Sequence, residues 1–499
     1  NASKVYDIDG YTWHDQKWFE TKKKVYQEPM LIYEVHLGSW RRKYGQFYKY
    51  NEIVEDLIKY IKEQGFTHIE LMPIYEHPLD DSWGYQGTGF FAATSRYGVP
   101  KDFMYLVDRC HQEGIGIIID WVLGHINKDA FGLSRFDGTY LYEFEDYKRR
   151  ENETWGTNNL DFGKGITRSF MLSALSFWMD YFHVDGFRID AVSHLFYHLG
   201  NKQNGLNVDA INFLKQASYH LFSKDDRLIF SAEDSTDFAY VTHPVDIGGV
   251  GFNYKWNMGY MNDTLNYFKL DPIYRKYHHN NITFGLVYAY NEQFILPFSH
   301  DEVVHMKGSL VNKMPGDYNQ KFANYRLLLT EWMTHPGKKL LFMGQEFAQF
   351  AEWDFRKELD WELYKYPIHD AFNHFFRDLS NIYRTHPALF QYDHNPKGFK
   401  WLIVDHYNTS VFSYARESDN ETLVVILNMT PNSYDSYEIG VPYPGSYEEI
   451  LNSDKDIYSG YNHINPKPLK TYDEGRNNMP YHIKVKLGSL AGIILKYIK

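Results

Sequence analysis

The sequence predicts an α/β protein built on a closed (β/α)8 TIM barrel and followed by a C-terminal antiparallel β-sandwich domain. Over the first four-fifths of the chain, eight short apolar runs alternate with longer amphipathic stretches, whereas the last hundred residues contain only short strand-like segments. Strand, helix and strand at this spacing indicate βαβ units with a parallel sheet, and eight such strands suggest closure into a barrel. A doubly wound open sheet is the alternative, but no glycine-rich dinucleotide loop follows any predicted strand.

The predicted barrel strands are the short apolar runs. They cover residues 31–37, 68–73, 116–122, 183–189, 227–232, 249–254, 294–299 and 339–343. The run IGIIID (115–120) lacks polar alternation, as expected for a strand covered on both faces. Amphipathic stretches predict helices over 52–64, 101–113, 166–182, 208–222, 319–333 and 368–383. The connection 123–165 is long for a βα loop, and such loops are usually functional.

The pattern divides the chain into three parts. Residues 1–30 form an N-terminal lead-in segment, and residues 31–395 form the predicted (β/α)8 barrel with its long loop at about 123–165. From about residue 396 to 499, the segments KWLIVD, SVFSYAR, TLVVILNMT, SYEIGV and AGIILKYI are separated by clusters of Asn, Asp, Gly and Pro. Short strands between such turn signals predict a small antiparallel all-β domain.

Composition excludes several function classes. The 52 Lys and Arg against 64 Asp and Glu give a net charge of −12, which argues against a nucleic-acid partner. The single cysteine, Cys110, excludes an intramolecular disulfide and a cysteine-rich metal cluster. No apolar run is long enough to span a bilayer, and residues 1–11 lack the apolar core of a signal peptide. We therefore expect a cytoplasmic protein without a membrane partner. We also expect a monomer.

Aromatic residues make up 18% of the chain. Their flat apolar faces stack on surfaces such as sugar rings, which suits a carbohydrate-binding protein. A general compositional bias explains the same number equally well, because Lys, Asn, Ile and Tyr are all plentiful.

Acidic residues stand where predicted strands give way to loops. Asp120 ends IGIIID, Asp190 ends HVDGFRID, Glu233 follows RLIFSA, and His300 and Asp301 follow FILPFS. In a TIM barrel these strand ends meet on one face, where active sites lie. Any one acid alone is more often a helix cap or a structural group. Four of them together, with histidines nearby, favour a catalytic site.

The surroundings of two of these acids suggest different roles. Arg188 and Asp190 are two residues apart on a strand and share a face, so the cation should lower the pKa of Asp190, as suits a nucleophile. Glu233 directly follows an apolar strand, and partial burial should raise its pKa, as suits a proton donor. Two carboxylates about 5–5.5 Å apart perform retaining glycoside chemistry. The alternative for Arg188 and Asp190 is a structural ion pair.

At these residues the sequence resembles the α-amylase family, glycoside hydrolase family 13. The family's four short conserved regions match DWVLGH (120–125), DGFRIDAVS (185–193), SAEDST (231–236) and FSHDE (298–302), in the family's order. Within the family it most resembles the 1,4-α-glucan branching enzymes, through YEVHLGSW (33–40), EHPLDDSWGYQGTGFFAATSRYG (76–98), GVGFNYKWNMGYMNDTL (249–265), LPFSHDEVVHMKGSL (296–310) and FMGQEFAQFAEWD (342–354). The resemblance covers nearly the whole chain.

The resemblance implies a role for each matching residue. Asp190 would be the nucleophile, Glu233 the general acid/base and Asp301 the carboxylate that stabilises the transition state. Arg188 would keep Asp190 ionised. The other implied roles concern the −1 subsite, which holds the sugar next to the cleaved bond. There His125 and His300 would donate hydrogen bonds to the sugar, Asp120 would order the pocket, and Tyr85 would be the platform under the ring. The implied substrate is an α-glucan polymer such as glycogen or amylose.

Some positions depart from the family pattern. Leu123, Ile126, Gly87, Asp234 and Met306 replace expected Pro, Phe, Pro, Glu and Gly, none at a catalytic position. Gly124 stands where calcium-binding amylases carry Asn, and calcium wants six or more oxygen ligands, so we expect no metal and no other cofactor. The resemblance also implies a carbohydrate-binding module before the barrel. Residues 1–30 do not contain one, so it lies outside this sequence or is lacking.

These inferences predict an enzyme that cleaves an α-1,4 bond and transfers the chain to a 6-hydroxyl, forming an α-1,6 branch by retaining double displacement. One alternative is a hydrolase of the same family, which gives the intermediate to water. Another is a catalytically silent glucan-binding protein, against which the intact acids Asp190, Glu233 and Asp301 argue.

Overall fold

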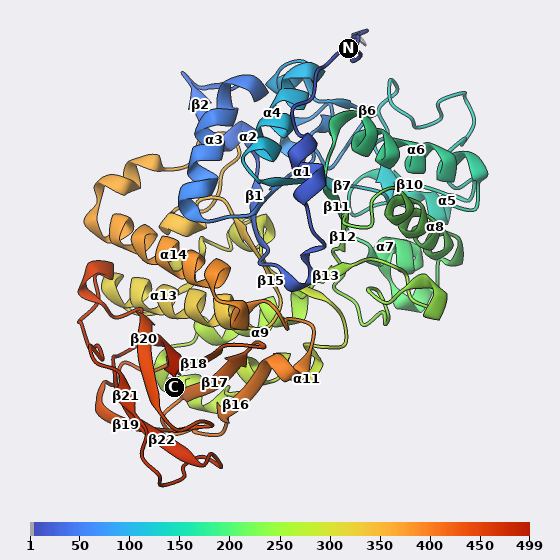
Figure 1. Ribbon diagram of the computed structural model, residues 1–499. Helices are drawn as coiled ribbons and strands as arrows, with labels where there is room; N and C mark the ends of the chain where they lie inside the picture. Colours follow the sequence, from blue (N-terminus) through green and yellow to red (C-terminus); the bar gives the residue numbers. More distant parts are fainter. Residues whose placement is uncertain (1–3) are drawn as a thin grey trace.

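The computed structural model describes residues 4–499 and contains a closed barrel of eight parallel strands (Figure 1). The strands are β1 (Leu31–Val35), β4 (His68–Leu71), β7 (Gly116–Trp121), β11 (Gly186–Ile189), β12 (Ile229–Ala232), β13 (Tyr254–Trp256), β14 (Phe294–Phe298) and β15 (Lys338–Phe342). Pairing of β15 with β1, in the register Leu31 to Lys339, closes the barrel. The predicted TIM barrel is therefore confirmed, and the open-sheet alternative is wrong.

The sixth strand differs from its prediction. The apolar pattern placed it at 249–254, whereas β13 begins only at Tyr254. The residues before it bond to an earlier loop instead: the Val250 N–H donates to Tyr240 O, and the Gly251 N–H donates to His243 O. Gly251 also has φ +95°, a left-handed conformation that a regular strand does not contain. Tertiary bonding thus shortens this strand.

Helices cover the barrel from outside. The longest are α3 (Tyr50–Gln64), α4 (Pro100–Gln112), α6 (Gly165–Phe182), α8 (Val208–Lys224), α9 (Met258–Phe268), α13 (Tyr318–Thr334) and α14 (Pro367–Thr385). The six predicted helices each match one of these within two residues at either end. The connection between β12 and β13, residues 233–253, lies entirely within the described part of the chain. It contains only one 3-10 turn, η6 (Val245–Ile247), in place of a helix.

Shorter elements lie in the N-terminal segment and in the loops. They are α1 (Gln16–Thr21), α2 (Leu37–Trp40), β2 (Arg42–Lys43), β3 (Gln46–Phe47), β5 (Tyr75–Glu76), β6 (Gly89–Ala93), β8 (His125–Ile126), α5 (Tyr147–Arg150), β9 (Glu151–Asn152), β10 (Thr157–Asn159), α7 (Ser193–Phe196), α10 (Asn280–Thr283), α11 (Gly285–Tyr288) and α12 (Leu310–Lys313). Strands β8, β10 and β9 form a small sheet within the long loop 123–165. No helix in the described part of the chain is long and apolar enough to cross a membrane.

The barrel interior is filled by side chains rather than open. Inward-facing residues of the strands form one buried cluster, including Ile32, Ile118, Ile229, Trp256 and Leu340. A larger cluster packs the outer faces of the strands against the helices. Burial on both faces explains why these strands read as continuous apolar runs, and the packed interior leaves the rim as the place for a site.

The C-terminal residues form two facing antiparallel sheets, seen in orange and red in Figure 1. One sheet has the order β16-β17-β18-β23-β20-β21 and the other pairs β19 with β22. The strands are β16 (Phe399–Ile403), β17 (Val411–Glu417), β18 (Thr422–Asn428), β19 (Tyr434–Val441), β20 (Ser446–Asn452), β21 (Leu469–Lys470), β22 (Tyr481–Leu487) and β23 (Gly492–Ile498). A separate apolar core includes Ile426, Val485 and Ile493, which confirms the predicted β-sandwich.

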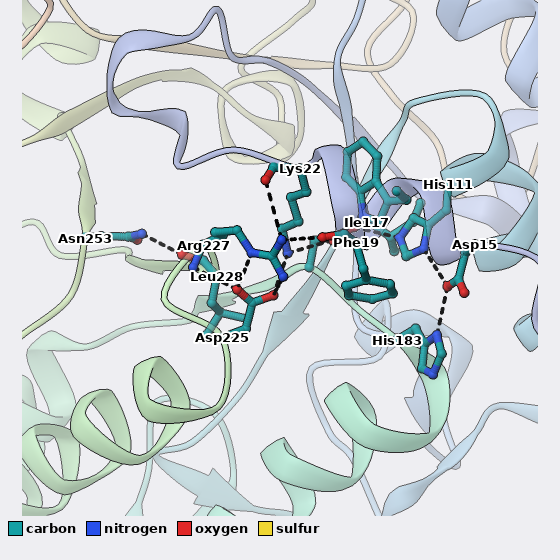
Figure 2. A network of polar contacts seen from close by, with 12 residues as sticks. Asp15, Phe19, Lys22, His111, Ile117, His183, Asp225, Arg227, Leu228 and Asn253 are labelled. Carbon is teal, nitrogen blue, oxygen red and sulfur yellow. Dashed lines mark hydrogen bonds and ion pairs between the residues drawn. The ribbon is translucent and has the colours of Figure 1, made fainter.

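The N-terminal segment is fastened beneath the barrel by a buried polar network (Figure 2). Asp185, which directly precedes β11, accepts hydrogen bonds from Trp18, His111 and the Ile117 N–H at 2.7–2.8 Å, and its carboxylate lies 2.9 Å from Lys22 Nζ. Four donors around one buried carboxylate hold it ionised. Asp185 therefore anchors the bottom of the barrel, although it belongs to the same motif as Asp190 at the top.

Candidate active site

Three acids meet around one arginine at the carboxyl ends of neighbouring strands. Arg188 Nη1 lies 2.7 Å from Asp190 Oδ1 and bonds both oxygens of Asp120 at 2.7 and 2.8 Å. Its Nη2 lies 3.6 Å from Glu233 Oε2. The guanidinium is fully buried over the ring of Trp256, 4.4 Å from the ring centroid. The structure thus brings together four of the predicted site residues, from β7, β11 and the end of β12.

The backbone after the proposed nucleophile also contributes. Ala191 has φ +47°, which is unusual for a residue with a side chain, and its N–H donates to Glu233 Oε2 at 2.7 Å. This bond fixes the Glu233 carboxyl beside Asp190. Such strained residues cluster at functional sites, where the surrounding structure holds them.

Burial dominates the electrostatics of the two carboxyl groups. It raises the pKa of Glu233 to about 7, with Arg188 opposing and Asp190 adding to the rise, which confirms the predicted direction. It also raises the pKa of Asp190 to about 6, because burial and the carboxylates of Asp120 and Asp301 outweigh Arg188. Arg188 does lower the pKa of Asp190, as predicted, but the net pKa of that carboxyl lies above its usual range. Asp190 still ionises before Glu233, which is the order that a nucleophile and a proton donor require.

His300 lies next to Tyr85 and is bonded twice to a buried acid. Its backbone N–H donates to Glu34 Oε2 at 2.8 Å, and the ring Nδ1 lies 2.6 Å from Glu34 Oε1. Burial opposes protonation, but Glu34 and Asp301 raise the pKa of His300 to about 10, so its ring is an imidazolium at neutral pH. That charge in turn lowers the pKa of Asp301, whose side chain is 44% exposed.

Tyr85 connects the Arg188 cluster with His300. Its hydroxyl donates to Asp120 Oδ2 at 2.5 Å and lies 3.3 Å from His300 Nε2, while its ring stacks against that of His300. The preceding residue, Gly84, has φ +96°, and a Cβ there would lie 2.2 Å from Pro73 O. Only glycine fits this turn, which brings the tyrosine to Asp120 and His300.

His125 is the predicted site residue least connected to the others. It lies on β8, buried, with its ring centroid 4.9 Å from that of Trp155, and burial lowers its pKa to about 3. Its Nδ1 has no hydrogen-bond partner among the described residues. His125 is therefore neutral and is not bonded to the carboxyl cluster.

Sequence reasoning missed Glu34, Ala191 and Trp256. Glu34 had a usable signal, since it is an acid inside the apolar run LIYEVHL. The positive φ of Ala191 and the packing of Trp256 on Arg188 left no such trace. Within residues 4–499, no group of three or more His, Cys, Asp or Glu side chains has an arrangement that could hold a metal ion.

Comparisons with known proteins agree with this architecture. The model of the alpha amylase catalytic domain matches residues 51–148, and that of the alpha amylase C-terminal all-beta domain matches residues 401–498. An alpha-amylase from Geobacillus thermoleovorans, solved with acarbose, superposes with a TM-score of 0.71 over 96% of this chain and all of its own, at 15% identity, and so shares the fold. These matches define a protein with the alpha-amylase domain pair.

Similarity over the whole of this chain identifies its family within this class of proteins. The chain is 50% identical to 1,4-alpha-glucan branching enzyme GlgB of Bacillus caldolyticus over 503 aligned residues, which cover all of this chain and 76% of that relative. The GlgB enzymes of Geobacillus stearothermophilus and Bacillus cereus (strain G9842) are 49% and 50% identical, again over all of this chain, and over 79% and 78% of their own lengths. The chain belongs to the 1,4-alpha-glucan branching enzyme GlgB family.

Proposed function

We propose that the protein is a branching enzyme that cleaves an α-1,4 bond of a linear glucan and transfers the severed chain to a 6-hydroxyl, forming an α-1,6 branch. The observation that carries this proposal is the pairing of Asp190 and Glu233 around Arg188 at the rim of the barrel, in a chain of the GlgB family. Paired carboxyl groups with separated pKa values are the machinery of retaining glycoside chemistry.

In the first half of the reaction, the Asp190 carboxylate attacks the anomeric carbon while Glu233 protonates the oxygen of the leaving chain. Glu233 Oε2 already accepts the Ala191 N–H, so the transferable proton resides on Oε1. The bond to the leaving oxygen breaks as the ester bond to Asp190 forms. Arg188 stabilises the carboxylate of Asp190 before attack and when it is released.

In the second half, Glu233 removes the proton from the 6-hydroxyl of another glucan chain. That oxygen attacks the anomeric carbon, and the bond to Asp190 breaks, so the configuration is retained and Glu233 regains its proton. His300 and Asp301 bind hydroxyls of the −1 sugar, Tyr85 lies under its ring, and Asp120 holds Tyr85 and Arg188 in position. His125 contributes a neutral imidazole to the wall of the pocket.

Linkage analysis after incubation with amylose tests this proposal. We expect new α-1,6 linkages with few new reducing ends, whereas abundant reducing ends without branches would identify a hydrolase. Asp190→Ala abolishes both, and Glu233→Gln lowers the rate about 10²- to 10⁴-fold, the usual contribution of a general acid/base. Unchanged activity in both variants would refute the site.

A further inference from the structure

A cleft of about 850 Å³ lies beside the proposed site, where the barrel has a loop in place of a helix. It is formed by the connection after β12 and the segment before β14. We call it the side cleft. Its lining includes Asp234, Thr236, Tyr240, Asn257, Tyr290 and Glu292. Nothing in the proposed mechanism uses this cleft.

Tyr240 is held in a strained conformation at the cleft. Its φ is +62°, in the left-handed region that residues with a side chain adopt at a cost of about 1–2 kcal/mol. Its side chain is not buried to compensate, because the residue is 60% exposed. Backbone strain of this kind clusters at ligand-binding and catalytic sites, so its presence in a residue that lines a cleft suggests a functional role for Tyr240.

The neighbouring backbone fixes this conformation from both sides. The Tyr240 carbonyl accepts the Val250 N–H at 3.0 Å. The two following amides, of Val241 and Thr242, donate to the two oxygens of Glu292 at 2.9 and 2.7 Å. Glu292 is therefore fully engaged in holding the loop, and the backbone of Tyr240, which lines the cleft, is fixed in place.

The chemistry of the cleft fits a neutral ligand that is rich in hydroxyls. Each of its acids is already paired: Asp234 with Lys255 at 2.8 Å, Asp237 with Lys202 at 2.8 Å, and Glu292 with backbone amides. The lining combines aromatic rings with amide and hydroxyl groups. A glucose ring offers an apolar face for stacking and hydroxyls at its edge, which matches this pattern.

The position of the cleft indicates which glucan chain it takes. Asp234 directly follows Glu233, and Trp256, whose ring packs on Arg188, also lines the cleft. A chain bound here lies next to the residue that must deprotonate the incoming 6-hydroxyl. We propose that the side cleft binds the acceptor α-1,4-glucan chain and that Tyr240 is the platform under one of its glucose rings. This inference rests on the branching reaction proposed above.

The test follows the fate of the glycosyl-enzyme intermediate. Amylose is the donor and an end-labelled maltodextrin is the acceptor, and the yields of labelled α-1,6 product and of new reducing ends are measured against acceptor concentration. For Tyr240→Gly we expect the acceptor KM to rise about three- to tenfold, as for loss of one aromatic contact. The ratio of transfer to hydrolysis falls, and Tyr240→Phe retains both. Because glycine relieves the backbone strain, the Tm of Tyr240→Gly does not fall.

Tyr44 is a matched control, since it also has positive φ (+52°) but is 98% exposed in the turn between β2 and β3. Tyr44→Gly leaves the acceptor KM and the transfer ratio unchanged. Three outcomes overturn the inference: unchanged KM and ratio in Tyr240→Gly, equal losses in both variants, or a lower Tm with a parallel loss of all activity. If the wild type forms no α-1,6 linkages, the branching function itself fails, which these outcomes do not imply.

Discussion

At the scale of single residues, burial has a stronger effect than charge pairing on the pKa values of the two carboxyl groups of the site. Arg188 lies 2.7 Å from Asp190, yet the pKa of that carboxyl is raised to about 6, because burial and the nearby acids prevail. Glu233, which accepts one backbone amide and lies farther from Arg188, is raised further, to about 7. The difference between the two groups gives each a role near neutral pH.

Activity should therefore have a bell-shaped pH dependence. It rises as Asp190 ionises near pH 6 and falls as Glu233 loses its proton near pH 7, with an optimum between about 6 and 7. The measurement is kcat/KM from pH 4 to 9. An α-glucosyl fluoride serves as the control substrate, because fluoride leaves without a proton, so its first half-reaction should lack the alkaline limb. An alkaline limb that persists with the fluoride would show that it does not come from Glu233.

Glu34 should position His300 and keep it charged. Glu34→Gln removes a buried carboxylate that receives two hydrogen bonds from His300, so the pKa of His300 falls towards neutrality. We expect kcat to drop about 10- to 100-fold, the usual effect of losing a charge-assisted hydrogen bond, and to drop most above pH 7. The pH profile of kcat distinguishes this role from a purely structural one.

Glu70 provides the control for this variant. It pairs with Glu34 in the register of the adjacent strand β4, is equally buried, and neither of its oxygens has a partner among the described residues. Burial raises its pKa well above the usual range, so it is already neutral and Glu70→Gln changes no charge. Matching pH profiles for the two variants would contradict the role of Glu34.

At the scale of elements, hydrophobic periodicity predicted most of the architecture because strands and helices are buried on regular faces. It failed at β13, where residues 249–253 bond to the loop at Tyr240 and His243, a contact that no local pattern encodes. The acids at strand ends were predictable because a barrel gathers them on one rim. The pKa of Asp190 was not, since it depends first on burial and then on Asp120 and Asp301, which reach it only through the fold.

The attachment of the N-terminal segment should depend on pH. Burial opposes ionisation of Asp15, but hydrogen bonds from His111 and His183 lower its pKa to about 2. A depressed carboxyl pKa contributes stability above its unfolded value near 4 and loses it as pH falls towards 2. Asp15→Asn should therefore lower the free energy of unfolding by roughly 1–2 kcal/mol at pH 7.

Urea unfolding at pH 7, 5 and 3 measures this contribution. The difference between wild type and Asp15→Asn should shrink between pH 5 and pH 3, as the wild type begins to lose the same charge. Asp9→Asn, at an exposed position of the same segment, should leave the stability within ±0.5 kcal/mol at every pH. A constant difference across the pH range would mean that Asp15 acts by packing alone.

At the scale of the whole molecule, buried arginines tie the barrel to the β-sandwich. Arg275 donates to Met429 O at 2.9 Å, and Arg326 donates to Ser453 O at 2.8 Å. Arg416, on β17, donates to the carbonyls of Thr334, Leu389 and Gly398 and bonds Asp393 at 3.1 Å. Because such bonds form only when both parts are folded, we expect the two domains to unfold together.

Arg416→Met tests this coupling. It fills similar space but leaves three carbonyls without their donor and Asp393 with Lys338 as its remaining cation, so stability should fall by about 3–5 kcal/mol. Arg416→Lys keeps the charge but not the planar set of donors, so its loss is intermediate. Arg476→Met, which removes an exposed ion pair with Glu438 in the same domain, costs less than about 1 kcal/mol. Calorimetry should show a lower Tm for Arg416→Met. The pH optimum of activity, measured below that Tm, should stay that of the wild type, because Arg416 does not contact Asp190 or Glu233. An unchanged Tm would mean that the bonds of Arg416 do not couple the two domains.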